Sequence, residues 1–348
     1  MSGIAGILTT NGQEPPEKLL HALSAKLKRR GQDDQGITLQ NGLGLIHQRL
    51  SIAPLDAGHQ PLCNESKLTL VTDCRLLKTQ EIKERFAETY NFSTTLDSET
   101  IFPLYEKYGA EFTHHLSGMY AIALYDGHAD ELILTRDPAG IKPLFYFSNK
   151  DYFVFASELK VLLSLDEIHT EVNQEARKES LQYGSTLGDR TLVSKVKSLL
   201  PGETLIVQEG RILKSFQDRP FEDLMPSKLN LKRSFAELPA QFCEALSDLD
   251  EPTEKIACFL ERPGDYLLAE ILDTSYQERT SCFSLVLDGE KEEKDQQLKV
   301  SNLREISLSE NEFWHTLPFV AAALDEPCNI PERALTYHLS KTVKDDFT

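Results

Sequence analysis

The spacing of hydrophobic residues in the first half of the chain predicts both helices and strands. Apolar residues recur at helical intervals from Leu19 to Leu27 behind Pro15-Pro16, which predicts an amphipathic helix that proline opens and Gly31 closes. The stretches Ile82 to Tyr90 and Ile101 to Tyr108 have the same spacing. Several adjacent strand-like runs favour an antiparallel sheet: Leu68 to Thr72, Met119 to Tyr125, Glu131 to Arg136, Leu144 to Phe147 and Tyr152 to Ala156.

The second half of the chain has a different pattern. Polar, proline-punctuated residues from about 217 to 234 predict a linker. Beyond it, apolar runs at Ile256–Leu260 and Cys282–Leu287 alternate with helical spacing at Tyr266–Leu272 and from Phe313 to Val320. Strand alternating with helix favours a parallel α/β sheet. We therefore predict two domains, residues 1–216 and 235–348, joined by the segment 217–234.

Composition narrows the choice of partners and compartment. The chain has 348 residues, 40% of them apolar, and a formal net charge of -18. Phosphate neutralisation needs clustered Lys and Arg, so this charge argues against nucleic acid and anionic membranes. The first twenty residues carry Glu14, Glu17 and Lys18 and lack the apolar run of a signal peptide or membrane helix, which predicts a cytoplasmic protein. Six cysteines without metal-ligand spacing predict free thiols and no metal site.

Several short segments together resemble a known family. In their order and separations they are similar to the glutaminase half of glutamine-hydrolysing asparagine synthetases, which are class II amidotransferases. This resemblance implies a four-layer αββα sandwich of the N-terminal nucleophile hydrolase type. The segments that carry it are Ser2-Gly3-Ile4-Ala5-Gly6-Ile7, Arg30-Gly31-Gln32-Asp33-Asp34, His47-Gln48-Arg49-Leu50-Ser51-Ile52, Gly58-His59-Gln60-Pro61, Gly118-Met119, Arg136-Asp137, Gly140-Ile141-Lys142-Pro143-Leu144 and Ala156-Ser157-Glu158.

Ser2 stands where the family keeps its cysteine nucleophile. Such hydrolases attack with the side chain of the first mature residue and use its α-amine as the base. Serine is chemically admissible once Met1 is removed. It is, however, a weaker nucleophile than cysteine near neutral pH, because a few per cent of a cysteine thiol is already thiolate.

Asp73 and Cys74 occupy the positions that match the family's oxyanion donors. There the family has Asn-Gly-Glu at the end of a strand, and here the strand is expected to end in Thr72-Asp73-Cys74-Arg75. Asp73 replaces a donor amide by a carboxylate, and Cys74 lacks the backbone freedom of glycine. Since one lost oxyanion donor costs on the order of 10²–10³ in rate, we expect Asp73 to impair amide hydrolysis.

Arg49 and Asp97 match the residues that hold the substrate amino acid in the family. The arginine would bind the α-carboxylate of glutamine through a bidentate contact, and the aspartate would receive the α-ammonium group. A glutamine-like small molecule could therefore still bind. The alternative is that Arg49 and Asp97 form a structural ion pair, or that Asp97 caps the helix that begins near Ile101.

The second domain departs from the family at its nucleotide loop. The resemblance places a pyrophosphatase-type loop, written roughly S-G-G-x-D-S, after Ile256–Leu260. At that place this chain adds a negative charge, removes one N–H donor and adds a bulky ring, so we expect neither ATP nor magnesium to bind well. The chain reaches Thr348 where the family enters its next core strand, which predicts a truncated domain. The degenerate loop consists of Glu261, Arg262, Pro263, Gly264, Asp265 and Tyr266.

These departures leave three hypotheses. The first is a pseudoenzyme that acts by binding an amino acid or a protein partner, for instance an intact paralogue or a second copy of the chain. The second is an enzyme that keeps amidohydrolase or amide-forming chemistry, either through Ser2 or with a partner subunit. The third is a structural subunit without a ligand. Function is decided by the chemistry of the site rather than by the fold.

Overall fold

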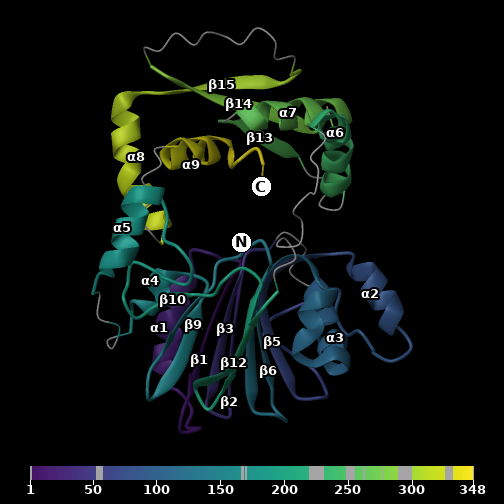
Figure 1. Cartoon of the computed structure of the whole chain (residues 1–348), viewed down its shortest axis with the longest axis vertical. Coiled ribbons are helices and arrows are strands. Elements are labelled where there is room, and N and C mark those ends of the chain that lie inside the picture. The colour runs from purple at the N-terminus through teal and green to yellow at the C-terminus, as the bar shows by residue number, and fades with distance from the viewer. Residues whose placement is uncertain are drawn as a thin grey trace. The chain divides into compact units, whose positions relative to one another are not determined.

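The chain forms two compact units, residues 1–224 and 225–348. The computed structural model describes residues 2–51, 58–165, 168, 171–218, 231–247, 255–261, 263–276, 278–288, 300–325 and 332–347. Figure 1 shows the mixed antiparallel and helical unit 1 and the smaller α/β unit 2. Each unit has its own hydrophobic core.

Unit 1 contains two six-stranded antiparallel sheets. The order of the first sheet is β10-β8-β9-β1-β3-β2, and that of the second is β12-β11-β7-β6-β5-β4. The strands of the first sheet are β1 (Gly3–Thr9), β2 (Asp34–Gln40), β3 (Leu43–Arg49), β8 (Phe145–Ser148), β9 (Tyr152–Ala156) and β10 (Lys197–Ser198). Those of the second are β4 (Leu62–Cys63), β5 (Leu68–Leu77), β6 (Ser117–Asp126), β7 (Glu131–Arg136), β11 (Glu203–Gln208) and β12 (Arg211–Gln217).

Helices cover the outer faces of both sheets, so unit 1 has the four layers αββα (Figure 1). One buried cluster lies between the sheets and includes Ile4 and Leu45 from the first and Val71 from the second. The outer face of the first sheet packs against α1 (Glu17–Leu27) and α4 (Leu159–Leu162). The outer face of the second packs against helical elements of residues 79–115. These elements are α2 (Thr79–Phe86), η2 (Asp97–Thr100), α3 (Ile101–Tyr108) and η3 (Gly109–His115); α5 (Gln174–Tyr183) completes the helices of unit 1.

The structure confirms the predicted sandwich and corrects some of its boundaries. Strands β7 and β9 have the predicted limits, and α1 ends at Leu27, one turn before Gly31. Helix α2 ends at Phe86 rather than at Tyr90. The largest correction concerns β5, which was expected to end near Thr72 but continues to Leu77 because β6 pairs with it over its full length.

Unit 2 contains a parallel sheet of three strands in the described residues, in the order β13-β14-β15, which confirms the predicted α/β pattern. The strands are β13 (Ile256–Leu260), β14 (Thr280–Leu287) and β15 (Leu303–Leu308). Helix α6 (Leu231–Ser247) begins inside the segment predicted as a linker, and residues 219–230 of that segment lie outside the described residues. The other helices are α7 (Pro263–Tyr276), α8 (Glu310–Ala323) and α9 (Glu332–Val343).

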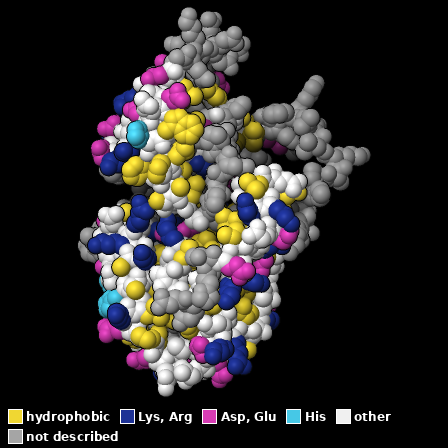
Figure 2. Space-filling model, turned by 90° about the vertical axis from the view of Figure 1, so that its left-hand side faces the viewer, with side chains coloured by type: hydrophobic (Ala, Val, Ile, Leu, Met, Phe, Trp, Pro, Cys, Tyr) yellow, Lys and Arg dark blue, Asp and Glu magenta, His cyan; other side chains and the backbone are white. Residues whose placement is uncertain are grey.

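The surface carries charges of both signs. On the face shown in Figure 2, Lys and Arg alternate with Asp and Glu over the described residues, and hydrophobic side chains are scattered among them. The largest exposed aromatic side chains include Trp314 and Phe319 of α8. Within the described part of the chain, no helix has both the length and the hydropathy needed to cross a bilayer.

Candidate functional site

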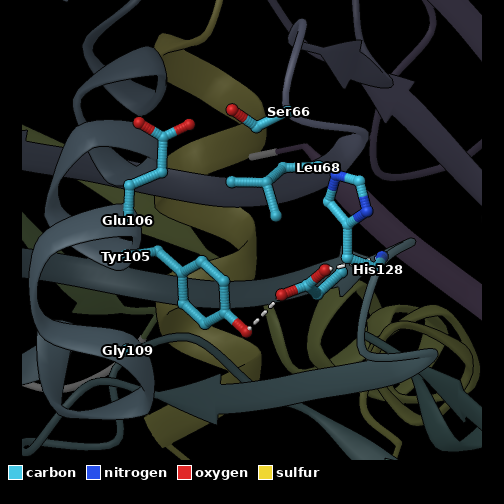
Figure 3. Close-up of a pocket in the computed structure, with 7 residues that line it drawn as sticks. Ser66, Leu68, Tyr105, Glu106, Gly109 and His128 are labelled. Carbon is cyan, nitrogen blue, oxygen red and sulfur yellow. Dashed lines mark hydrogen bonds between the residues drawn. The ribbon is translucent and has the colours of Figure 1, made fainter.

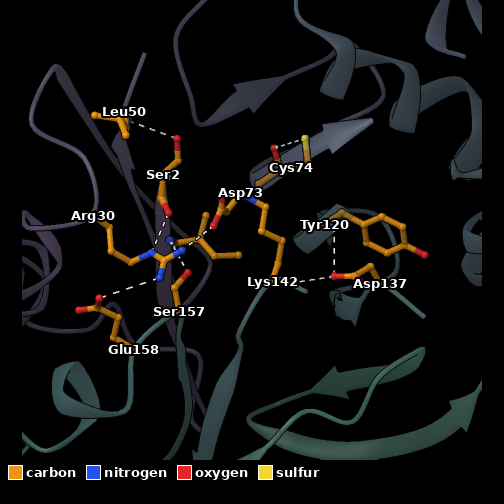
Figure 4. Close-up of polar contacts among 12 residues, drawn as sticks. Ser2, Arg30, Leu50, Asp73, Cys74, Tyr120, Asp137, Lys142, Ser157 and Glu158 are labelled. Atoms are coloured by element: carbon orange, nitrogen blue, oxygen red, sulfur yellow. Dashed lines mark hydrogen bonds and ion pairs between the residues drawn. The ribbon is translucent and has the colours of Figure 1, made fainter. Parts of the chain in front are cut away.

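Ser2 lies at the start of β1, where two other elements of unit 1 contact it. Its Oγ accepts a hydrogen bond from the Leu50 backbone N–H at 3.3 Å. Its carbonyl oxygen accepts another from Arg30 Nε at 2.8 Å (Figure 4). Alternate residues of β1, Ile4 and Leu8, face the space between the sheets, so the Ser2 side chain is directed to the same side at the end of the sandwich.

Glycine at position 31 explains how Arg30 reaches Ser2. A Cβ at Gly31 would lie 2.4 Å from the backbone carbon of Arg49, so only glycine lets the turn after α1 approach β3 this closely. The same turn carries Arg30 to the start of β1, where its guanidinium contacts Ser2. The segment Arg30-Gly31 therefore has a positioning role that its sequence alone did not reveal.

Asp73 is held between two cations beside Ser2. Its Oδ2 accepts from Arg30 Nη2 at 2.8 Å and its Oδ1 accepts from Lys142 Nζ at 2.8 Å. The side chains of Asp73, Arg30 and Lys142 are only 3%, 9% and 8% exposed. Figure 4 shows the carboxylate lying between the guanidinium and the ammonium group. Both carboxylate oxygens of Asp73 are thus engaged in buried ion pairs.

A tight turn brings Lys142 to this position. The buried Asp137 carboxylate accepts hydrogen bonds from the N–H groups of Ile141 and Lys142 at 2.9 and 3.0 Å. Gly140, with φ of +65°, closes the turn. Sequence analysis used this segment only as part of the family resemblance, and it singled out neither Lys142 nor Arg30 as a site residue. A carboxylate predicted at a buried site needs cationic partners, and this requirement was the signal that could have identified them.

Asp73 and Cys74 are neighbours in β5, but their side chains point to opposite faces. Val71 faces the space between the sheets, and Asp73 follows it on that face. Cys74 packs against the helix-covered cluster, and its thiol lies 3.3 Å from Thr72 Oγ1. Burial raises the pKa of the Cys74 thiol to about 12, so the group is neutral and unreactive at neutral pH.

The backbone N–H of Cys74 points towards the edge of β5 that faces away from β6. The Thr72 N–H donates to the side-chain Oε1 of Gln60 at 2.7 Å on the edge of β5 that faces away from β6. Because N–H directions alternate along a strand, the Cys74 N–H faces that same edge. Cys74 lies within a regular strand and has no positive φ, so the expected loss of glycine's backbone freedom causes no strain here.

His47 is a buried group near the site that sequence reasoning did not single out. It lies on β3, is 2% exposed, and neither ring nitrogen has a hydrogen-bond partner among the described residues. Burial lowers the pKa of His47 to about 4, although the nearby charges of Asp73 and Asp34 act in the opposite direction. The imidazole is therefore neutral at physiological pH.

Arg49 and Asp97, the predicted ligand-binding pair, lie on different elements of unit 1. Arg49 ends β3, is 7% exposed and donates from Nη1 to the Gly58 carbonyl at 2.6 Å. Asp97 begins η2, and its half-exposed carboxylate accepts from Thr79 Oγ1 at 2.8 Å. Since no side-chain cap bond is made at η2 or α3, the structure gives the helix-capping alternative no support. Burial is the main cause of the raised pKa of Cys74, and the charges of Asp73 and Asp97 act in the same direction.

The predicted loop of unit 2 leads from β13 into α7. Pro263 is the first residue of α7, a position proline favours, and Gly264 has open space around it. Asp265 accepts the Glu261 N–H at 3.0 Å, and the Glu261 carboxylate accepts from Thr336 Oγ1 at 2.7 Å. Two carboxylates therefore stand at the helix end where a phosphate would need N–H donors, so these residues do not fit a nucleotide phosphate.

The other two residues of the predicted loop are Tyr266 and Arg262. Tyr266 packs against the core cluster of unit 2, so its ring takes part in that core. Arg262 lies outside the described residues. The described residues contain no group of three or more His, Cys, Asp and Glu side chains placed to hold a metal ion.

A separate hollow lies on the helix-covered side of the second sheet (Figure 3). Its volume is about 340 Å³, and α3 and the adjoining ends of β5 and β6 line it. Three of its polar side chains are already engaged, because Tyr105 Oη donates to Asp126 at 3.1 Å and Glu106 accepts from Asn64 at 2.9 Å. Leu68 is the first residue of β5 and pairs with Asp126, whereas Asp73 lies later in the same strand, so the hollow is distinct from the Ser2 site.

Comparison with known proteins identifies the family of unit 1. The pattern of the glutamine amidotransferase domain matches residues 1–217. Asparagine synthetase [glutamine-hydrolyzing] 2 of Bacillus subtilis is 35% identical over 168 residues, which cover 47% of this chain and 22% of that protein. Asparagine synthetase B of Escherichia coli K12 is 36% identical over 167 residues, covering 47% and 30%.

One relative aligns along nearly the whole chain. Asparagine synthetase [glutamine-hydrolyzing] 1 of Bacillus subtilis is 24% identical over 343 residues, 95% of this chain and 54% of that protein. The chain thus spans about half or less of the length of these curated relatives. Among solved structures, the glutamine phosphoribosylpyrophosphate amidotransferase of B. subtilis superposes with a TM-score of 0.45 at 21% identity, covering 62% of this chain and 49% of that one.

Proposed function

Because the chain belongs to the family of glutamine amidotransferase domains, we propose that residues 1–217 bind an amino acid such as glutamine without hydrolysing it efficiently. The observation that carries this proposal is the Asp73 carboxylate, held by Arg30 and Lys142 beside Ser2. In this proposal the protein acts through binding, as an asparagine-synthetase-like pseudoenzyme, rather than through turnover.

The chemistry of Asp73 supports slow or absent turnover. Attack on an amide carbonyl creates an oxyanion that needs donors fixed around it. An ionised carboxylate only accepts hydrogen bonds, and both oxygens of Asp73 already accept from cations. The side chains of Arg30 and Lys142 each form an ion pair with Asp73, so they are not free to replace the missing amide donor. Serine in place of cysteine adds a second, independent loss of reactivity.

Retained ligand-binding groups support the binding half of the proposal. Arg49 is buried, and the backbone of the next residue, Leu50, lies at Ser2, since its N–H donates to Ser2 Oγ. A guanidinium suits the α-carboxylate of an amino acid, and the half-exposed Asp97 carboxylate suits its α-ammonium group. We extend the proposal to unit 2. Because the carboxylates of Glu261 and Asp265 would repel a nucleotide phosphate, we infer that ATP is not a ligand.

The proposed function also includes a protein partner, because a protein that acts through binding needs a partner on which to act. The partners we consider are an intact paralogue and a second copy of the chain. The chain spans only part of its relatives, and their synthetase activity is not assumed for it.

A second candidate function is residual amide hydrolysis through Ser2. The direction of the Cys74 N–H favours it, since one backbone donor of the family's arrangement still faces the open edge of β5. The Ser2 Oγ is also placed by a backbone N–H rather than buried in the core. This candidate requires catalysis with a single retained donor.

The test measures binding and turnover in the same preparation of the full chain, with removal of Met1 confirmed by mass. Glutamine binding is followed by calorimetry, and ammonia release is followed over hours. We expect binding that Arg49→Ala abolishes and no ammonia above the Ser2→Ala background. Ammonia that disappears in Ser2→Ala establishes the second candidate instead. Absence of any glutamine binding contradicts the amino-acid proposal.

A further inference from the structure

Two cysteines face each other in the core of unit 2. Cys258 on β13 and Cys282 on β14 are register partners in the parallel ladder. Figure 1 shows the two strands side by side. Both thiols are free, and the residues are 5% and 1% exposed. Neither cysteine belongs to the Ser2 site or to the loop of Glu261 and Asp265.

The geometry of the pair suits a covalent bond. Neighbouring strands lie about 4.8 Å apart, and disulfides join Cα atoms about 4.4–6.8 Å apart. Cys258 and Cys282 both belong to the cluster that packs against Ala269 and Leu272 of α7, so their side chains project from the same face of the sheet.

We propose that Cys258 and Cys282 form a redox-active dithiol that a peroxide converts to a disulfide between β13 and β14. The proposal does not depend on the function assigned to unit 1. A disulfide within a protein whose other thiols stay reduced is typical of redox sensing rather than of structural stabilisation.

The closeness of the two register partners assigns the two roles. The neighbouring Cys282 thiol lowers the pKa of Cys258, and the neighbouring Cys258 thiol raises the pKa of Cys282. Cys258 is therefore the attacking sulfur and Cys282 the resolving one. The Cys258 thiolate attacks one peroxide oxygen, the O–O bond breaks, and the departing oxygen leaves as water after taking a proton, which gives a sulfenic acid.

The second step closes the bridge. The Cys282 sulfur attacks the sulfenic sulfur, the S–S bond forms, the S–O bond breaks, and the hydroxide leaves as a second water with the Cys282 proton. Two thiols are oxidised by two electrons in total, and one peroxide is reduced to two waters. Because both sulfurs are buried, attack follows local opening of unit 2 and is slower than at the exposed Cys63.

Oxidation would act on the part of unit 2 that leads into α7. Cys258 lies on β13, which is followed directly by Glu261. The Glu261 N–H donates a hydrogen bond to the Asp265 carboxylate in the first turn of α7. A covalent link to β14 ties this strand to its neighbour. The expected consequence is lower exchange of backbone amides in β13 and at the first turn of α7.

The test uses the full chain treated with hydrogen peroxide, alkylated under denaturing conditions and mapped by mass spectrometry. We expect a linked pair of peptides containing Cys258 and Cys282, lighter by two hydrogens and cleaved by dithiothreitol. Cys258→Ser and Cys282→Ser each abolish the link, whereas Cys243→Ser, a matched control on α6, retains it.

Other outcomes overturn the proposal. It fails if Cys258 and Cys282 both remain alkylatable after other cysteines have been oxidised. It also fails if either forms its bridge with Cys63 or Cys243 instead, or if both go to sulfinic acids without a linked species. The mapping of the unsubstituted protein decides the question even if a serine variant does not fold. Glutamine binding by unit 1 is a separate measurement, so failure of one proposal leaves the other intact.

Discussion

Lys142 Nζ lies 2.8 Å from Asp73 Oδ1, although 69 residues separate the two along the chain. This contact, with that of Arg30 on the other oxygen, makes Asp73 the centre of a buried ion cluster beside Ser2. Breaking a buried pair leaves a charge that neither water nor a partner stabilises. Asp73, which the proposed function makes the obstacle to catalysis, is therefore also a residue on which local stability is expected to depend.

Replacing Asp73 by alanine should lower the free energy of unfolding by about 3–5 kcal/mol, because Arg30 and Lys142 then lose their shared partner. Urea denaturation monitored by circular dichroism gives the value. Asp97→Ala is the control: its carboxylate is half exposed, and removing its contact with Lys83 should cost about 0–1 kcal/mol. Equal losses in the two variants would show that the cluster has no special role.

Restoring the family's donors should raise glutaminase activity stepwise. Ser2→Cys alone supplies a better nucleophile but leaves the carboxylate in place. Ser2→Cys combined with Asp73→Asn and Cys74→Gly should release ammonia from glutamine at least about 10²-fold faster than Ser2→Cys alone. Coupled ammonia assays, with thermal melts to confirm folding, make the comparison. The role assigned to Asp73 is wrong if both variants turn over at the same rate.

Cys74 should resist alkylation at pH 8. With a pKa of about 12, only about one thiol in ten thousand is ionised there, and only the thiolate reacts. Cys63 is exposed and serves as the internal reference. Iodoacetamide treatment of the native protein followed by peptide mapping should show Cys63 modified and Cys74 intact. Modification of both at similar rates would contradict the buried, neutral thiol.

His47 should make the protein less stable as the pH falls. Its folded pKa of about 4 lies below the ordinary histidine pKa of 6.5, so between these values the unfolded state binds more protons. The stabilisation is complete above about pH 6.5 and is lost as the pH falls towards 4, by roughly 3 kcal/mol. Denaturant titrations from pH 7.5 to 4 measure it.

Substituting His47 tests whether its imidazole causes this pH dependence. His47→Leu should have a flatter pH dependence than the unsubstituted protein, while His21→Leu, which changes an exposed histidine, should follow the original curve. Parallel curves for the His47→Leu and unsubstituted proteins would show that the imidazole is solvated in the folded state.

Local sequence patterns located some of the buried strands but not all of them. Strands β7 and β9 have the predicted limits because continuous burial leaves continuous apolar runs, and the partly buried β13 was also located by its apolar run. Strands β1 and β3 are buried along nearly their whole length and were not predicted. The edge strands β2 and β15 were not predicted, since most of their residues are partly or fully exposed and give no such run. The excess length of β5 was also missed, because it comes from pairing with β6 rather than from its own composition.

The candidate site likewise combines properties that the sequence determines with properties that only the tertiary structure determines. Sequence by itself determined the chemical type of each group, since a hydroxyl at Ser2, a carboxylate at Asp73 and a thiol at Cys74 are local properties. Tertiary structure decided what these groups do. It brought Arg30 and Lys142 to Asp73 and turned Cys74 to the opposite face, because ion pairs and burial depend on segments that only folding places together.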